Sequence, residues 1–193
     1  ILVITNIDDD HLDYYKDSAD IDSAFREMAQ RVPEDGFIVA DLNNERVNNV
    51  LAGVKAHVIN YREVEEEGIV LKGKYNRENA RAALAVLSCL SLPVAAARAS
   101  LNSFSGTWRR FELKGTTTTG ALVFDDYAHH PTEIAATLQL AAESYPGKNL
   151  IAVFQPHLYS RTKEHLHEFA AAFAPASQVI LAPIYVHKIC RSD

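Results

Sequence analysis

Two short apolar segments in the second half of the chain end abruptly in polar residues, just before a helical pattern begins. The first is Leu122-Val-Phe-Asp-Asp-Tyr-Ala-His-His-Pro-Thr-Glu133, and the second is Val153-Phe-Gln-Pro-His-Leu-Tyr-Ser-Arg-Thr162. A buried strand, a polar turn and a helix in this order are typical of open α/β sheets, which carry their chemistry at the carboxyl ends of the strands. We therefore expect the two strand ends to line one site for a nucleotide-derived substrate.

The first half of the chain alternates apolar runs with helical patterns. Strands are predicted over residues 1–5, 37–40 and 57–60, and helices over 20–32 and 44–51. Strands and helices in strict alternation predict a parallel sheet covered by helices. The fold class is therefore expected to be α/β.

The region that follows is predicted to be mostly helical. After a charged turn over residues 63–67, one further strand is expected over 69–71. An alanine-rich helix over 76–90 and a second helix over 95–104 come next, because alanine is the best helix former.

A second alternating pattern begins beyond residue 107. Strands are predicted over residues 111–114, 121–126, 150–155 and 179–183. One helix is expected to begin at Pro131, whose missing N–H is no loss in a first helical turn, and another helix should carry Leu166, Phe169 and Phe173. We expect two domains, over 1–107 and 108–193.

Composition excludes several classes of protein. The 193 residues carry a formal net charge of -6, which argues against a nucleic-acid backbone as the main partner. Cys89 and Cys190 lie far apart, so neither a disulfide framework nor a CxxC metal site is expected, and a cytoplasmic location is the default. No apolar run reaches the roughly 18 residues of a membrane span. The oligomeric state stays open.

The strand-end residues are the first candidates for chemistry. Asp126 either contributes to a site or closes a turn before the helix. His129 and His130 fall at a helix start, where the helix dipole favours bound anions. Consecutive parallel strands are usually neighbours with their carboxyl ends at one edge, so His157 and Arg161 are expected to face Asp126 and His130.

A loop near the start of the chain is rich in acids around His11. The acids are Asp8, Asp9, Asp10 and Asp13. Their oxygen atoms could bind a divalent cation with the imidazole as one more ligand, or the loop could simply be solvated. The spacing does not match an EF-hand.

Three further polar residues could contact a nucleotide. Asn76 and Asn79 are spaced i, i+3 at a helix start and share one face, where they could bind a ligand or serve as a cap and its neighbour. Arg110 lies between the two expected domains, and its planar guanidinium could reach a phosphate. No glycine-rich GxxxxGKT or GxGxxG loop occurs in the sequence.

Five motifs in this order resemble the Mur ligases of bacterial cell-wall synthesis. They are Thr5-Asn-Ile-Asp-Asp-Asp-His-Leu-Asp-Tyr-Tyr15, Asn76-Arg-Glu-Asn79, Phe104-Ser-Gly-Thr-Trp-Arg-Arg-Phe-Glu112, Asp125-Asp-Tyr-Ala-His-His-Pro-Thr-Glu-Ile134 and Phe154-Gln-Pro-His-Leu-Tyr-Ser-Arg-Thr162. Each motif alone is weak, but five in order are specific. Gln-Pro-His and Ser-Arg-Thr favour the alanine-adding branch over the branch that recycles murein peptides.

The resemblance implies an ATP-dependent enzyme of peptidoglycan synthesis that joins L-alanine to UDP-N-acetylmuramate through an acyl phosphate, with Mg²⁺ as cofactor. It implies part of a parallel-sheet central ATPase domain over 1–107 and a Rossmann-like, amino-acid-binding C-terminal domain over 108–193. It also implies roles for single residues. His11 would be a magnesium ligand. The residues that would bind ATP are Asn76, Asn79, Arg110 and Asp126, and the catalytic residues would be Asp126, His130 and His157. Substrate would be bound by Tyr127, His129 and Arg161.

The sequence also departs from the family pattern. Tyr75 stands where the family usually has His, and Leu158 stands where the alanine-adding branch usually has Arg. Because the family's N-terminal domain and phosphate loop are absent, we expect these 193 residues alone to be inactive. Two other functions stay open, a non-catalytic binding or assembly module and a metallohydrolase built from Asp126, His129, His130 and His157.

Overall fold

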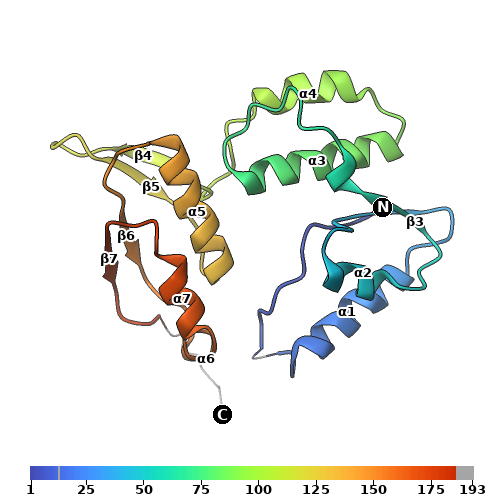
Figure 1. Cartoon of the computed structure of the whole chain (residues 1–193), viewed down its shortest axis with the longest axis horizontal. Helices are drawn as coiled ribbons and strands as arrows, with labels where there is room; N and C mark the ends of the chain where they lie inside the picture. Colours follow the sequence, from blue (N-terminus) through green and yellow to red (C-terminus); the bar gives the residue numbers. More distant parts are fainter. Residues whose placement is uncertain (13, 186–193) are drawn as a thin grey trace, which may run out of the picture. The chain divides into compact units, whose positions relative to one another are not determined.

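A computed structural model describes residues 1–12 and 14–185 of the chain (Figure 1). Asp13 of the acidic loop and Cys190 lie outside these residues. The chain divides into two compact units, Ile1–Phe104 and Ser105–Asp193, called unit 1 and unit 2 below. Within the described residues, no helix combines the length and apolar character that crossing a membrane requires.

The predicted parallel sheet is present in unit 1. Its strands are β1 (Leu2–Ile4), β2 (Phe37–Ala40) and β3 (His57–Asn60), paired in parallel in the order β1-β2-β3. The helices α1 (Ser18–Gln30) and α2 (Glu45–Leu51) connect the strands. Parallel neighbours need such crossovers, which explains the alternation in the sequence.

Alternate residues of β2 build two separate cores. Ile38 and Ala40 pack with α1 and α2 on one face of the sheet. Val39 points to the other face, where it meets Tyr61 and the helix α3 (Lys74–Cys89). A strand covered on both faces is apolar at every position, as β2 is.

The expected strand over residues 69–71 is wrong. This stretch follows the short 3-10 helix η1 (Tyr61–Glu63) and has no strand structure. The Val70 N–H donates to the side chain of Asn102, at the end of α4 (Val94–Asn102), and not to a neighbouring strand. Val70 is exposed, so its apolar character is not used in a sheet.

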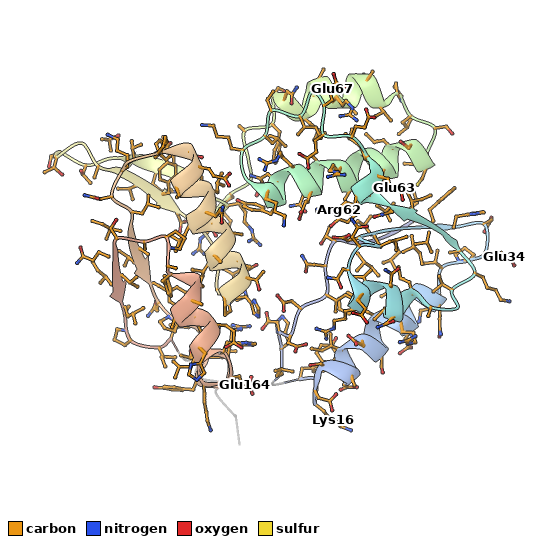
Figure 2. The ribbon with its side chains drawn as sticks, viewed as in Figure 1. Lys16, Glu34, Arg62, Glu63, Glu67 and Glu164 are labelled. Atoms are coloured by element: carbon orange, nitrogen blue, oxygen red, sulfur yellow. The ribbon has the colours of Figure 1, made fainter. Side chains whose placement is uncertain are left out.

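The charged turn is at the surface, as expected. Glu63 and Glu67, both labelled in Figure 2, are exposed. Arginines of the following helices hold this turn. Arg98 donates to the backbone oxygens of Glu65 and Glu67, and Arg81 pairs with Glu66 at 2.9 Å.

Unit 2 contains two separate pairs of strands. The strands β4 (Glu112–Thr116) and β5 (Leu122–Asp125) pair antiparallel with a bulge between Leu113 and Gly115. The strands β6 (Ile151–Phe154) and β7 (Gln178–Leu181) pair in parallel. The mixed α/β class is therefore confirmed, with parallel pairing in both units.

The helices of unit 2 are α5 (Pro131–Ser144), α6 (Tyr159–Glu164) and α7 (Leu166–Ala172). Helix α5 begins at Pro131, as predicted. The helix expected to carry Leu166, Phe169 and Phe173 corresponds to α7, whose C-cap is Phe173. The short helix α6 before it was not predicted, and His165 separates the two helices. Ile134 of α5 packs on Phe169 and Ala172 of α7, and this small core brings α5 and α7 together.

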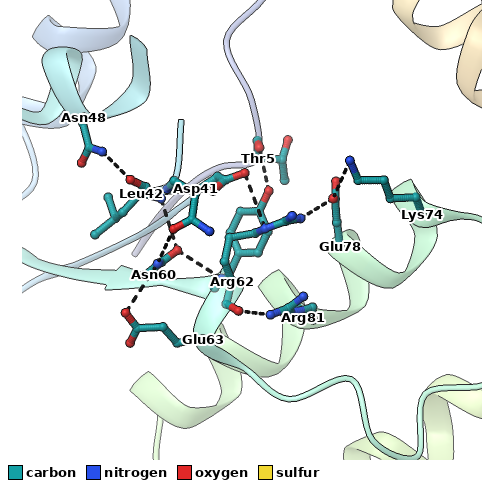
Figure 3. A network of polar contacts seen from close by, with 12 residues as sticks. Thr5, Asp41, Leu42, Asn48, Asn60, Arg62, Glu63, Lys74, Glu78 and Arg81 are labelled. Carbon is teal, nitrogen blue, oxygen red and sulfur yellow. Dashed lines mark hydrogen bonds and ion pairs between the residues drawn. The ribbon is translucent and has the colours of Figure 1, made fainter. Parts of the chain in front are cut away.

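A polar network joins the ends of the unit 1 strands to α3 (Figure 3). The Tyr61 hydroxyl donates to the backbone oxygen of Thr5 at 2.9 Å, just beyond β1. Arg62 pairs with Glu78 of α3 and lies 3.8 Å from Asp41, just beyond β2. The network fixes the first turns of α3 at the carboxyl edge of the sheet, where open α/β folds bind ligands.

Replacing Tyr61 by Phe tests this network. Tyr61 is 2 % exposed, and burial, followed by nearby carboxylates, raises its pKa to about 12. Losing the hydroxyl should lower the free energy of unfolding by about 1 kcal/mol at pH 7. Because the folded pKa exceeds the unfolded one, wild-type stability should also fall from pH 10 to pH 12, and Tyr61→Phe should remove that slope.

Urea unfolding at pH 7, 10 and 12 measures both effects. Tyr14→Phe is the matched control, because Tyr14 is 81 % exposed. Equal stabilities for the two variants at pH 7 would show that the Tyr61 bond contributes nothing.

Candidate functional site

The segment from Arg109 to Phe111 is fastened to the end of β5 by backbone hydrogen bonds. The Phe111 N–H donates to one carboxylate oxygen of Asp126 at 2.7 Å, and the Ala128 N–H donates to the other at 2.8 Å. The Tyr127 N–H donates to the Arg109 carbonyl at 2.8 Å. Asp126 therefore closes this turn, and each oxygen keeps a lone pair for a further donor or a cation.

Two residues of this segment have left-handed backbone conformations. Arg109 has φ +53° and Phe111 has φ +49°. Such positions cost free energy in residues with a Cβ and persist where surrounding contacts hold them. Arg109 is held by Asp125 at 3.1 Å, and its guanidinium lies over the Tyr127 ring at 4.9 Å. The strained segment presents the Arg110 guanidinium, which is 47 % exposed.

The two histidines form the start of α5 with a capping box. His130 is the N-cap, and its ring nitrogen Nδ1 accepts from the Thr132 N–H at 3.4 Å. Glu133 accepts from the His129 N–H at 3.0 Å and from the His130 N–H at 3.3 Å. The box satisfies backbone donors that a helix start otherwise leaves open. His130 is buried, with 7 % of its surface exposed.

The Glu133 carboxylate also meets two charged groups. It lies 3.5 Å from the Arg110 guanidinium and 3.6 Å from Nδ1 of His129. Burial tends to raise the pKa of Glu133, but the His129 and His130 backbone N–H groups and the nearby positive charges together hold it below its usual value. The carboxylate is therefore ionised at neutral pH and contacts three predicted site residues.

The expected pairing of the two strand ends is wrong, although the segments do meet. Strand β5 pairs antiparallel with β4, and β6 pairs with β7. The core between α5 and α7 brings the segments together instead, and the His130 ring meets the His165 ring at 4.9 Å. His130 therefore lies beside the α6–α7 junction. This junction, at His165, is one helical turn beyond Arg161.

The second strand end has an unusual backbone. Leu158 has φ +70°, a conformation that leucine rarely adopts. Its N–H donates to the Tyr185 carbonyl at 3.1 Å, and His157 stacks on the Tyr185 ring at 5.2 Å. Arg161 is 7 % exposed and donates to the His157 carbonyl at 3.4 Å. A buried guanidinium beside a strained turn is typical of a built polar site.

The asparagines of unit 1 lie in the first turns of α3. Asn76 donates to the Lys72 carbonyl at 2.9 Å, and Asn79 is exposed. Between them, Glu78 is paired with Arg62 in the network of Figure 3. The ion pair anchors this part of α3, on a different face from the asparagines.

The loop of His11 is anchored through its acids. Arg46 pairs with Asp9 at 2.8 Å and with Asp22 of α1 at 2.6 Å. His11 is 67 % exposed, and its Nε2 lies 3.8 Å from Asp10. In the part of the chain that the structure describes, no three His, Cys, Asp or Glu side chains form a metal-binding group.

These residues fit Mg²⁺ only as a partial ligand set. Mg²⁺ usually takes one or two protein ligands and completes its shell with water and substrate phosphates, so a complete protein cage is not required. The acid-rich loop supplies hard oxygen donors next to His11, which suits this ion better than a softer metal.

Sequence reasoning missed Glu133 and the Arg62–Glu78 pair. An acid at the third position of a helix that begins with Pro131 is a typical capping signal, so Glu133 could have been found. The Arg62–Glu78 pair joins residues 16 apart, and no local pattern indicates it.

Two family models match this chain. Residues 1–69 match the Mur ligase middle domain, and residues 109–188 match the glutamate ligase domain of Mur ligases. The UDP-N-acetylmuramate--L-alanine ligase of Caldanaerobacter subterraneus is 40 % identical over 214 residues, which are 96 % of this chain and 46 % of that protein. The chain thus spans about half the length of the curated relatives it matches.

Two solved structures are similar to the chain. The UDP-N-acetylmuramate-alanine ligase of Thermotoga maritima has a TM-score of 0.69 and 27 % identity, over 95 % of this chain and 46 % of that one. A murein peptide ligase from Psychrobacter arcticus has a TM-score of 0.66 and 25 % identity, over 93 % of this chain and 42 % of that one. The resemblance inferred from the five motifs is confirmed, and the chain belongs to the Mur ligase family.

Proposed function

We propose that this chain serves an ATP-dependent ligase that joins L-alanine to UDP-N-acetylmuramate in peptidoglycan synthesis. One observation carries the proposal: a relative named for this reaction matches 96 % of the chain at 40 % identity. The geometry supports it, because unit 2 builds a polar site from the Arg109–Phe111 segment, the start of α5 and the start of α6.

The proposed reaction has two steps. The sugar carboxylate attacks the γ-phosphorus of ATP, which forms an acyl phosphate and releases ADP. The amine of L-alanine then attacks the acyl carbon, which forms the amide and releases phosphate and a proton. Charge develops on phosphate oxygens in the first step, so a ligase of this kind needs positioned cations.

The ATP-binding roles go to residues of both units. Asn76 and Asn79 would contact the nucleotide from α3, Arg110 would reach its phosphates, and Asp126 would bind ATP while it closes the Arg109–Phe111 turn. The exposed guanidinium of Arg110 supports its role, because it is held in place and still open to a ligand.

The substrate roles go to the two strand ends of unit 2. His130 and His157 would lie around the acyl phosphate, and Arg161 would bind the carboxylate of L-alanine. Tyr127 and His129 would contact substrate from the turn before α5, where their rings meet edge to face at 5.2 Å.

His11 would hold Mg²⁺ together with ligands from the substrate phosphates. When bound, the ion offsets negative charge on the transferred phosphoryl group. We assign residues 1–107 to the ATPase domain and 108–193 to the amino-acid-binding domain. A cytoplasmic location is proposed, since ATP and UDP-linked sugars are its substrates.

A second candidate function is the ligation of murein peptides to the same sugar. The match to the Psychrobacter arcticus ligase favours it. Leu158 is a further reason to keep it, because one arginine expected in the alanine-adding branch is missing. Assaying L-alanine and a murein tripeptide side by side separates the two functions.

A chimeric ligase tests the proposed function. In this chimera, the chain replaces the matching segment of the Caldanaerobacter subterraneus relative, and product is measured from UDP-N-acetylmuramate, L-alanine, ATP and Mg²⁺. The chimera should form product, whereas the 193 residues alone should not. A chimera with a cooperative thermal transition and no product with either acceptor would favour the non-catalytic module.

Two substitutions test the site in the chimera. His11→Ala should lower kcat at least about 100-fold with Tm unchanged, because the side chain is 67 % exposed. Asp126→Ala should lower kcat about as strongly and also destabilise the fold by about 1–3 kcal/mol, since two backbone N–H groups lose their acceptor. Steady-state kinetics and thermal unfolding measure both, and wild-type rates in both variants would remove these assignments.

Leu158→Arg tests the carboxylate site. A second guanidinium near Arg161 should lower the KM for L-alanine about tenfold, because bidentate Arg–carboxylate contacts are strong. Leu158→Lys is the matched control and should improve KM less, since ammonium lacks the planar fork. Equal KM values for the three proteins would contradict this placement.

A further inference from the structure

One carboxylate in unit 2 contacts three predicted site residues that come from two separate segments. Glu133 accepts hydrogen bonds from the backbone of His129 and His130, and it forms an ion pair with Arg110, which lies 23 residues earlier. These contacts exceed what a helix cap requires, because a capping box uses only the N-cap residue and its partner.

We propose that Glu133 is a positioning residue of the ligase site, holding the Arg110 guanidinium and the His129–His130 turn in one arrangement for the phosphates of ATP. The inference rests on the proposed function and deepens it. It assigns to Glu133 an action through Arg110, without contact to the substrate.

The ion pair with Glu133 orients the Arg110 side chain. The side chain is long, nearly half exposed and free to adopt many rotamers unless something orients it. The Arg110 guanidinium donates to the Glu133 carboxylate at 3.5 Å, and this contact orients it. The backbone N–H groups and nearby positive charges outweigh burial and hold the pKa of Glu133 below its usual value, so the carboxylate is charged at neutral pH and the pair persists under assay conditions.

The hydrogen bonds from the His129 and His130 backbone to Glu133 order the turn before α5. They fix the turn between β5 and α5, at which the N–H groups of a helix start favour anions. Arg110 and this turn are thereby oriented by the same carboxylate. A ligand that bridges them would lose both if the carboxylate were removed.

The substitution Glu133→Gln separates positioning from capping. The amide oxygen of glutamine still accepts from the His129 and His130 N–H groups, whereas the charge that orients Arg110 is lost. In the chimera, the KM for ATP should rise about tenfold, since one charge-assisted contact is affected, with kcat within about threefold of wild type. Tm should change little, because the cap remains.

Two further variants complete the series. Glu133→Ala removes cap and charge, so both Tm and the KM for ATP should worsen. Glu143→Gln is the matched control on the same helix, because Glu143 is exposed and contacts Gln139 at 3.4 Å. It should behave as wild type in every measurement.

The direction in which Glu133→Gln changes the KM for ATP tests the inference. If Glu133 only screened the charge of Arg110, Glu133→Gln would lower the KM for ATP, and an unchanged or lower KM overturns the proposal. A Tm loss in Glu133→Gln as large as in Glu133→Ala, with kcat and KM affected alike, would assign a purely structural role and overturn it as well.

A measurement on the 193-residue chain distinguishes this failure from a failure of the proposed function. The side-chain Nε–H signal of Arg110 is followed by NMR in wild type, Glu133→Gln and Glu143→Gln. A shift in Glu133→Gln alone is expected, and identical spectra would overturn the inference. A folded chimera without activity would reject the proposed function and leave this NMR result unchanged.

Discussion

Carboxylates that accept backbone N–H groups hold the described site together. Asp126 ties the Arg109–Phe111 segment to the end of β5, and Glu133 ties the His129–His130 turn to α5. Each of these acids uses hydrogen bonds that a charged acceptor makes stronger than a neutral one. Because the segment includes two left-handed residues, it keeps its shape only while such bonds hold it.

In unit 1, side-chain ion pairs anchor the loops that follow the strands. Arg46 joins the His11 loop to α1, and Arg62 joins the ends of the strands to Glu78 of α3. In both units, charged groups sit where strands end and irregular backbone begins. Irregular backbone lacks the regular hydrogen bonds of a sheet or helix, so these ion pairs hold it in place instead.

The two residues that depart from the family pattern, Leu158 and Tyr75, lie in a turn and in a helix that are formed despite the change. Leu158 has a left-handed backbone beside the buried Arg161, so the turn is built although one expected arginine is missing. Tyr75 lies in the first turn of α3, next to Asn76. Neither change alters the elements that carry the five motifs, which explains why the family resemblance survives them.

The sequence by itself determined the elements whose signals are local. The strands β2 and β3 and the start of α5 follow from apolar runs and from Pro131, and the motifs identified the family. Tertiary structure alone decided the partners of β5 and β6 and the contact of Glu133 with Arg110. Strand partners and ion pairs depend on distances between segments far apart in the chain, and periodicity within one segment carries no information about those distances.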